Sequence, residues 1–173
     1  MILVVPAGSV DRAEALTNER ERVVVVEGGS TRQESVANGL RHADTANVLV
    51  HDAARPFIEA ALVQRLVDAL GSSDGVIPVL PVGETVKEIA GSRVVGTVDR
   101  SDLALSQTPQ LFRTEPLRRA HERAADEGYM STDDAELIER YEGDVATVPG
   151  SRRNIKLTYA EDFELAESML GSS

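Results

Sequence analysis

Short apolar runs that alternate with helical patterns are the feature that most constrains the fold of this chain. The clearest run is a stretch of four valines at 23–26, and comparable runs occupy residues 1–5, 47–50 and 75–82. Strands that are apolar on both faces are typical of a parallel sheet covered by helices on both sides. The intervals between the runs suit crossover helices, which predicts right-handed βαβ connections. The chain is therefore expected to be an α/β protein.

Helical patterns fill most of the intervals between these runs. An apolar residue recurs every four positions from 58 to 70, as on one face of an amphipathic helix. Thr31 with Glu34, and Thr158 with Glu161, fit capping boxes at the starts of two further helices. Helices are predicted over residues 11–19, 31–40, 58–70, 114–128, 131–141 and from 158 onward. The last of these is expected to bury Phe163, Ala166, Met169 and Leu170.

A β-hairpin is predicted over residues 85–98. The residues alternate between polar and apolar on either side of a glycine-containing turn at 90–92. A two-stranded hairpin that has no core of its own is marginally stable. We therefore expect it to pack on another surface, and a second subunit is the natural candidate.

Composition restricts the class of protein. A length of 173 residues is typical of one domain, and the absence of cysteine excludes disulfide frameworks and thiolate metal sites. The net charge of −11 argues against a nucleic-acid binder, which needs a basic surface. No apolar run approaches the roughly 20 residues of a membrane span, and residues 1–6 lack the basic start of a signal peptide. A cytoplasmic protein without a membrane partner is expected.

Positive charge is scarce and therefore informative. Lys87 and Lys156 are the two lysines of the sequence, beside sixteen arginines. An anionic small substrate would have to be attracted by a local cluster of such cations in an acidic chain. A lysine at a motif position is thus a stronger candidate for a functional residue than one more arginine. The alternative is a salt-adapted or GC-rich composition.

The stretch that follows the run at 47–50 is the strongest candidate for a binding site. Residues 50–56 read VHDAARP. Asp52 would lie at the carboxyl end of a buried strand, where ligands bind in open α/β sheets, and its carboxylate suits a hard divalent cation. Ala53 leaves room for a ligand near the backbone, and Arg55 supplies a planar cation suited to phosphate. An N-capping Asp beside a surface Arg is an equally open interpretation of these residues alone.

A second candidate lies at the start of the helix at 31–40. Gly28 and Gly29 precede the helix, leaving free N–H groups and room for a phosphate or ribose. A plain strand-to-helix turn is the favoured interpretation of this stretch alone. No Gly-x-Gly-x-x-Gly follows the first strand, which disfavours a Rossmann dehydrogenase. The sequence around Ser35 does not show the pattern of a catalytic triad, so a serine hydrolase is not supported.

Taken together, the motifs resemble those of one enzyme family along nearly the whole chain. In order they are Gly28-Gly29 with Arg32 and Ser35-Val36, VHDAARP at 50–56, TVDR at 97–100, TPQ at 108–110 with Phe112, Thr132-Asp133, and NIK at 154–156. This combination resembles the 2-C-methyl-D-erythritol 4-phosphate cytidylyltransferases of the non-mevalonate (methylerythritol phosphate) isoprenoid pathway. Ribitol 5-phosphate cytidylyltransferases share most of the motifs and remain the alternative.

The resemblance implies a fold and an activity. The fold would be a three-layer, Rossmann-like nucleotidyltransferase fold in one domain over residues 1–173, with a mostly parallel sheet, helices on both faces and a protruding β-hairpin arm at 83–101. The activity would be transfer of CMP from CTP to 2-C-methyl-D-erythritol 4-phosphate, with release of pyrophosphate and with Mg²⁺ as cofactor. The arm would reach the active site of a second subunit in a homodimer.

The resemblance also assigns roles to residues. Asp52 is implied as the Mg²⁺ ligand. The nucleotide would contact Gly28, Gly29, Ser35, Asp52 and Ala53, whereas the acceptor and the reacting phosphates would contact Arg55, Thr85, Arg100, Thr108, Thr132 and Lys156. Lys156 and Arg55 would be the catalytic cations. The acceptor phosphate is already a nucleophile, so no general base is required, and His51 is expected to be structural.

One part of the family pattern has no counterpart in this sequence. The family begins with a strand, a Gly-rich loop that carries an Arg, and a Pro-Lys element, which together grip the triphosphate. Residues 6–9 read PAGS and lack those basic residues. The chain is therefore expected to lack this N-terminal phosphate loop, and a catalytically incomplete, dimerising fragment of the family is a further alternative.

Overall fold

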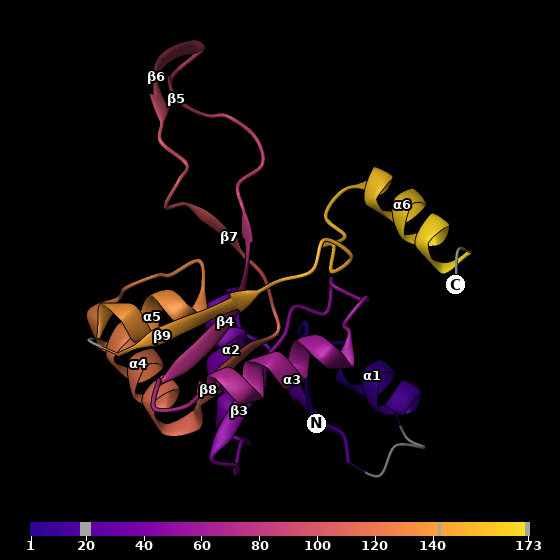
Figure 1. Ribbon diagram of the computed structural model, residues 1–173. Helices are drawn as coiled ribbons and strands as arrows, with labels where there is room; N and C mark the ends of the chain where they lie inside the picture. The colour runs from indigo at the N-terminus through magenta and orange to yellow at the C-terminus, as the bar shows by residue number, and fades with distance from the viewer. Residues whose placement is uncertain (18–21, 142, 172–173) are drawn as a thin grey trace. The chain divides into compact units, whose positions relative to one another are not determined.

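A computed structural model describes residues 1–17, 22–141 and 143–171 of the protein (Figure 1). The chain divides into two compact units. The first is formed by Met1–Val50, Leu70–Val76 and Leu111–Ala146, and the second by His51–Ala69, Ile77–Gln110 and the residues from Thr147 onward. The single domain and the three-layer arrangement expected from the sequence stay predictions.

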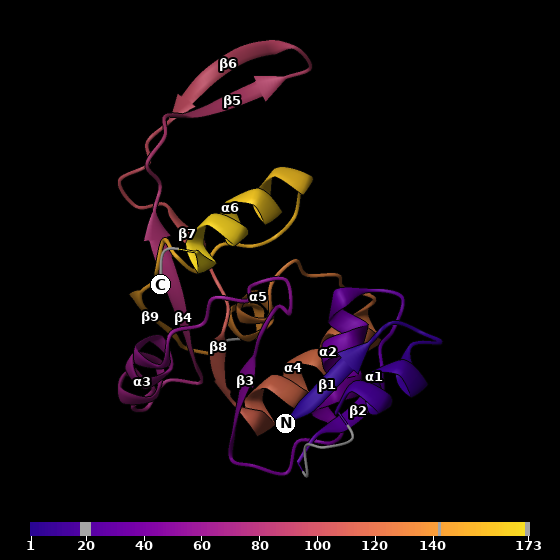
Figure 2. The same cartoon turned by 90° about the vertical axis from the view of Figure 1, so that its right-hand side faces the viewer.

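The first unit contains most of the helical segments. Its elements are β1 (Ile2–Val5), α1 (Val10–Thr17), β2 (Val24–Glu27), α2 (Arg32–Leu40), β3 (Asn47–Val50), α4 (Thr114–Glu127) and α5 (Asp134–Arg140), with parts of β4 (Gly75–Pro81), β8 (Gln110–Arg113) and β9 (Val145–Pro149). The strands β1 and β2 pair in parallel, with α1 and α2 packed on them (Figure 2). The valine run thus forms a parallel strand, as predicted, but the strand is not buried on both faces. The predicted end of the first helix, Glu19, lies outside the described residues.

The core of the first unit is built from the buried face of α4 and its neighbours. Leu117, Ala120 and Ala124 are buried on α4. In the strand pair β4–β8, Phe112 lies opposite Gly75, and a Cβ atom at Gly75 would come within 2.5 Å of the Phe112 ring. The helix ends at Gly128, whose φ of 64° is readily adopted by glycine. The predicted helix over 114–128 is confirmed.

The second unit carries the hairpin. Its elements are α3 (Ala60–Ala69), β5 (Val86–Ala90), β6 (Arg93–Val98), β7 (Ala104–Ser106) and α6 (Ala160–Leu170), with the remaining parts of β4, β8 and β9. Leu62 and Leu66 of α3 are fully buried. The antiparallel hairpin β5–β6 extends away from β4 and β7 in both views (Figure 1, Figure 2). The predicted hairpin and its turn are confirmed.

The structure does not support the mostly parallel sheet predicted from the sequence. β4 pairs antiparallel with β8 in the first unit and antiparallel with β7 in the second. The hairpin is the reason. After β4 the chain forms β5 and β6, and it then returns through β7 and β8 in the direction opposite to β4. An apolar run indicates a strand but carries no information about the direction of its neighbours. It does not establish burial on both faces either, because Val24 of β2 and Leu49 of β3 are 47% and 40% exposed.

The closing helix differs from its prediction at both its cap and its face. Its start is capped by Asp162, whose carboxylate accepts the N–H groups of Thr158 and Tyr159 at 2.7 and 2.8 Å, rather than by Glu161. Of the four residues expected inside, Ala166 is buried, whereas Phe163 and Leu170 are 57% and 67% exposed. The apolar face of α6 is therefore largely uncovered in the described structure.

No helix in the described part of the chain is long and apolar enough to cross a membrane.

Candidate functional site

The second unit brings together the side chains of Asp52 and Lys156. Lys156 Nζ lies 2.9 Å from Asp52 Oδ2, although the two residues are 104 positions apart. Asp52 belongs to the segment 51–59 between β3 and α3, and Lys156 to the segment 150–159 between β9 and α6. A backbone bond from Leu157 N to Ala54 O, at 2.8 Å, holds the two segments side by side. The two residues with the strongest sequence predictions are thus direct partners.

Arg55 is fixed by the same pair of segments. Its backbone N–H donates to Asp52 O at 2.9 Å, which closes a turn, and its NH1 group donates to Asn154 O at 2.7 Å. Burial lowers the pKa of the Arg55 guanidinium, and the nearby Asp52 carboxylate partly opposes that shift. An arginine starts from such a high pKa that it stays charged at any physiological pH. Arg55 therefore holds the loop of Lys156 and keeps a cation beside Asp52.

Thr108 joins this group through its hydroxyl. The hydroxyl oxygen accepts the N–H of Asp52 at 3.0 Å and lies 3.1 Å from His51 Nδ1. The Thr108 side chain is buried, with an exposed fraction of 5% for the residue. Asp52, Arg55, Thr108 and Lys156, all of them predicted site residues, therefore form one connected group in the second unit. We call these four residues the Asp52–Lys156 cluster.

Two buried amides that the sequence reasoning missed support the cluster. Asn154, which is 0% exposed, donates from Nδ2 to Thr108 O at 2.7 Å. Gln107, which is also buried, donates from Nε2 to Ser151 O and Asn154 O at 3.0 and 3.2 Å. Both residues stand within or beside predicted motifs. The sequence carries no signal that identifies them, because their neighbours are themselves polar, as in SQT at 106–108 and RRN at 152–154.

The surroundings of Asp52 fit the Mg²⁺ that the resemblance predicts. No group of three or more His, Asp or Glu side chains forms a metal-binding cluster among the described residues. Mg²⁺ is often held by one or two carboxylates together with phosphate oxygens of the substrate. Asp52 has a side chain that is 16% exposed and lies beside cations suited to phosphate. The donor set fits a metal ion shared with a nucleotide and does not fit an all-protein metal site.

The first unit contains the predicted nucleotide turn. Ser35 Oγ accepts the N–H of Gly29 at 3.1 Å and donates to Thr31 O at 2.8 Å. A Cβ atom at Gly28 would lie 2.7 Å from Ser35 Oγ, and one at Gly29 would lie 2.2 Å from Glu34 Cβ. The first turn of α2 itself therefore requires glycine at both positions. Thr31 caps α2 as predicted, accepting the N–H of Glu34 at 3.1 Å.

The carboxylate of Glu34 bonds back to the turn that precedes α2. Its carboxylate accepts both the hydroxyl and the N–H of Ser30, each at 2.7 Å. The Ser30 hydroxyl, and then the Ser30 N–H, hold the pKa of the Glu34 carboxyl below its ordinary value. A carboxylate in the first turn of a helix is also favoured by the helix dipole.

A buried network in the first unit connects the start of α2 to the segment that carries Thr132. Gln33 donates from Nε2 to Tyr129 O at 3.0 Å, and its Oε1 accepts the N–H of Ser131 at 2.8 Å. Arg32 NH1 lies 2.7 Å from Asp134 Oδ2, and Asp134 is 1% exposed. The structure thus links the predicted nucleotide turn with the Thr132 segment, although Thr132 itself bonds to Glu136.

The remaining predicted residues lie elsewhere in the second unit. Ala53 is exposed in the turn between Asp52 and Arg55. Thr85 and Arg100 are exposed at the base of the hairpin, where Arg100 donates to Gly83 O. The structure does not bring Thr85 or Arg100 to the Asp52–Lys156 cluster within one chain.

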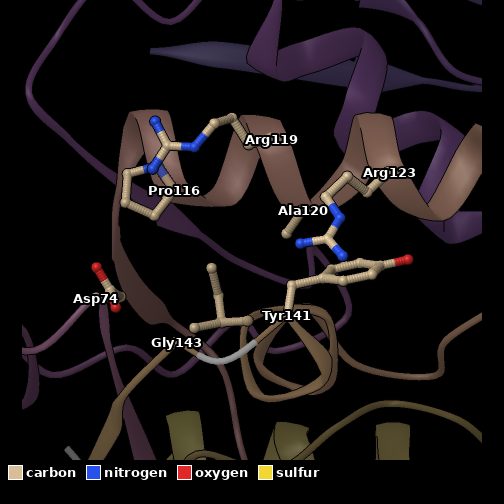
Figure 3. A pocket seen from close by; sticks show the side chains of 8 residues that line it. Asp74, Pro116, Arg119, Ala120, Arg123, Tyr141 and Gly143 are labelled. Carbon is tan, nitrogen blue, oxygen red and sulfur yellow. The ribbon is translucent and has the colours of Figure 1, made fainter.

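A hollow of about 300 Å³ in the first unit contains none of the predicted site residues. It is lined by Asp74, Pro116, Arg119, Ala120, Arg123, Ile138, Tyr141 and Gly143 (Figure 3). The Arg123 guanidinium lies over the Tyr141 ring, 4.1 Å from its centroid (Figure 3). The Asp52–Lys156 cluster, which contains predicted site residues, therefore remains the candidate site.

Comparison with known proteins agrees with these motifs. The family model described as 2-C-methyl-D-erythritol 4-phosphate cytidylyltransferase matches residues 1–172. Proteins of that name from Geotalea uraniireducens and Acidobacterium capsulatum are 46% and 41% identical, over 86% and 96% of this chain and 65% and 74% of their own length. The crystal structure of 2-C-methyl-D-erythritol 4-phosphate cytidylyltransferase from Thermus thermophilus is 34% identical, with a TM-score of 0.83 and 98% of each chain covered. The chain thus spans about two thirds to three quarters of the length of these two curated relatives. Because the family model matches residues 1–172, the chain belongs to the 2-C-methyl-D-erythritol 4-phosphate cytidylyltransferase family.

Proposed function

We propose that this protein transfers CMP from CTP to 2-C-methyl-D-erythritol 4-phosphate and releases pyrophosphate. The observation that carries the proposal is the Asp52–Lys156 cluster, which gathers a carboxylate and two cations from distant segments. The family model and the relatives named for this reaction support the choice of nucleotide and acceptor. The product would be a cytidine diphosphate ester of methylerythritol, an intermediate of isoprenoid synthesis.

The proposed reaction is a direct displacement. An oxygen of the acceptor phosphate bonds to the α-phosphorus of CTP while the bond from that phosphorus to the bridging oxygen of the β-phosphate breaks, and pyrophosphate leaves with the electron pair. Because the acceptor phosphate is already an anion, no side chain has to remove a proton. Catalysis then depends on positioning and on neutralising charge in the transition state.

The roles of the cluster residues follow from their chemistry. Lys156 offers a point charge for the oxygens of the α-phosphate, and Arg55 a planar cation beside the acceptor phosphate. Asp52 would hold Mg²⁺ together with phosphate oxygens. When bound, Mg²⁺ would supply charge neutralisation at the phosphates. The Asp52–Lys156 pair keeps both charges satisfied until substrate phosphates compete for them.

Gly28, Gly29 and Ser35 are proposed to face the nucleoside, with Ala53 near the ribose. Thr132 is proposed at the acceptor phosphate. The hairpin at 83–101 is proposed as an arm that contributes Thr85 and Arg100 to a second copy of the chain in a homodimer. Its exposed apolar side chains support this proposal, because they have no cover in the described chain: Ile89, Val94 and Val95. A cytoplasmic location stays a prediction.

Product identification tests the proposed reaction. The purified chain is incubated with CTP, MgCl₂ and either methylerythritol 4-phosphate or ribitol 5-phosphate, and the products are analysed by mass spectrometry. The proposal expects the cytidine diphosphate ester of methylerythritol. Formation of the ribitol ester alone would contradict the proposed acceptor, and formation of neither ester would contradict the activity of this chain.

A further inference from the structure

His51 is the one residue of the VHDAARP stretch with a titratable side chain and no role in the proposed reaction. It contacts two residues of the Asp52–Lys156 cluster that come from different segments, Arg55 and Thr108. Its Nε2 is 2.9 Å from Arg55 O, and its Nδ1 is 3.1 Å from Thr108 Oγ1. Both ring nitrogens are thus engaged within the second unit.

The contacts of the ring determine which nitrogen donates. A carbonyl oxygen can only accept, so Nε2 must carry the hydrogen that is given to Arg55 O. Nδ1 of the neutral ring is then an acceptor, and the hydroxyl of Thr108 is the donor that faces it. Each atom of this arrangement then has a partner of the correct kind.

The same arrangement assigns the hydroxyl of Thr108. The Thr108 proton points to His51, and a lone pair of its oxygen receives the N–H of Asp52 at 3.0 Å. A chain of bonds therefore runs from Asp52 N–H to Thr108 and His51, and ends on the carbonyl of Arg55. It begins and ends on the two charged residues of the 52–55 turn.

We infer that His51 is a positioning residue, which orients the Thr108 hydroxyl and thereby fixes the backbone of Asp52. The ring is held on both sides, so it is not available to remove a proton from a substrate. The consequence for catalysis rests on the proposed function, because the Asp52 backbone sets the direction of a carboxylate proposed to hold Mg²⁺. Displacing a reacting group by about 1 Å can cost on the order of 100-fold in rate.

Two conservative variants test the two contacts of the His51 ring separately. In His51→Asn the side-chain oxygen replaces Nδ1 as the acceptor for Thr108, while the contact to Arg55 O is lost. In His51→Gln the side-chain amide replaces Nε2 as the donor to Arg55 O, while the acceptor for Thr108 is lost. His51→Ala removes both contacts, and His42→Asn changes an exposed histidine as the matched control.

The direct readout is the exchange of the Asp52 backbone amide hydrogen, measured by NMR on the full chain. The melting temperature of each variant is measured as well. We expect exchange at Asp52 to be at least about 10-fold faster in His51→Gln and His51→Ala than in the unmodified chain, and nearly unchanged in His51→Asn and His42→Asn. Equal exchange in His51→Gln and the unmodified chain, or equal acceleration in His51→Asn and His51→Gln, would overturn the inference. This readout requires no catalysis, so it is separate from a failure of the proposed function.

Turnover of the same variants gives the second readout. His51→Gln is expected to lower kcat by about 10- to 100-fold, and His51→Asn to keep most of it. In Thr108→Val, which removes the hydroxyl, the further change His51→Gln should have little added effect, because both changes break the same chain of bonds. Full additivity of the two losses would overturn the inference. If His51→Gln melts at too low a temperature to be assayed, Thr108→Ser, which keeps a hydroxyl, is compared with Thr108→Val, which lacks one.

Discussion

Lys156 and Asp52 form a 2.9 Å ion pair that joins segments 104 positions apart, with side chains that are 46% and 16% exposed. An exposed pair of this kind adds little to stability, usually between about 0 and 1 kcal/mol. The pair is therefore not expected to contribute much to stability. It places a cation beside the carboxylate that is proposed to hold Mg²⁺.

The loop of Lys156 depends on a buried amide. Replacing Asn154 with Ala removes the donor to Thr108 O and leaves that buried carbonyl without its partner. We expect the free energy of unfolding to fall by about 2 kcal/mol, in the range for an unsatisfied buried group. Urea denaturation measures this change, and Asn47→Ala, at an exposed asparagine, is the control. Equal midpoints for the two variants would contradict the structural role of Asn154.

The predicted nucleotide turn requires glycine for a packing reason. In Gly29→Ala the new Cβ would lie 2.2 Å from Glu34 Cβ, so the turn must shift. We expect a loss of about 1–3 kcal/mol of stability, typical of overpacking, together with weaker CTP binding. Gly83→Ala is the control, since a Cβ there meets nothing within 4 Å. Calorimetric titration with CTP and thermal melting measure the two effects, and an unchanged melting temperature for Gly29→Ala would contradict the geometry.

The same turn should show a defined pH dependence. The pKa of Glu34 is lowered in the folded chain by its bonds to Ser30, so this carboxylate stabilises the fold when ionised. That contribution is complete above the unfolded pKa, about 4.3 for glutamate, and is lost as the pH falls through the lower folded value. Glu34→Gln should therefore melt below the unmodified chain at pH 7, and the difference should shrink as the pH approaches 3. A difference that grows on acidification would contradict the assigned bonds.

The hairpin provides a test of assembly. Val95 is 59% exposed on β6, and Val95→Glu would place a charge in the proposed dimer contact. We expect light scattering after gel filtration to give the mass of two chains for the unmodified protein and of one chain for Val95→Glu. Lys87→Met, a change on the neighbouring strand β5, tests whether any alteration of the hairpin has this effect. A single-chain mass for the unmodified protein at all concentrations would contradict the proposed arm.

Local features of the fold could be predicted from the sequence. The start of α2 after Thr31 and the end of α4 at Gly128 depend on capping chemistry within a few residues. The antiparallel partners of β4 could not be predicted in this way, because pairing depends on the return path of the chain after the hairpin. The exposed Phe163 shows the same limit: its spacing indicates an apolar helix face and does not identify what covers that face.

The members of the candidate site could be predicted where they carry charge or stand in a family motif. Residue type and motif indicate Asp52, Arg55 and Lys156, the motif alone indicates Thr108, and the structure brings the four together. The supporting residues Gln107 and Asn154 could not be predicted, because a buried amide has no chemistry of its own to identify it. Its importance appears only when its partners are known.

Pyrophosphate release with CTP, Mg²⁺ and methylerythritol 4-phosphate, compared between the two lysine variants, tests the central proposal most directly. Lys156→Met removes one of the two cations of the cluster, whereas Lys87→Met removes the other lysine of the sequence, on the hairpin. We expect release by the unmodified chain, a loss of about 100-fold or more in Lys156→Met, and a much smaller change in Lys87→Met. Equal rates for the unmodified chain and Lys156→Met, or no release by the unmodified chain, would contradict the assignment of catalysis to the Asp52–Lys156 cluster.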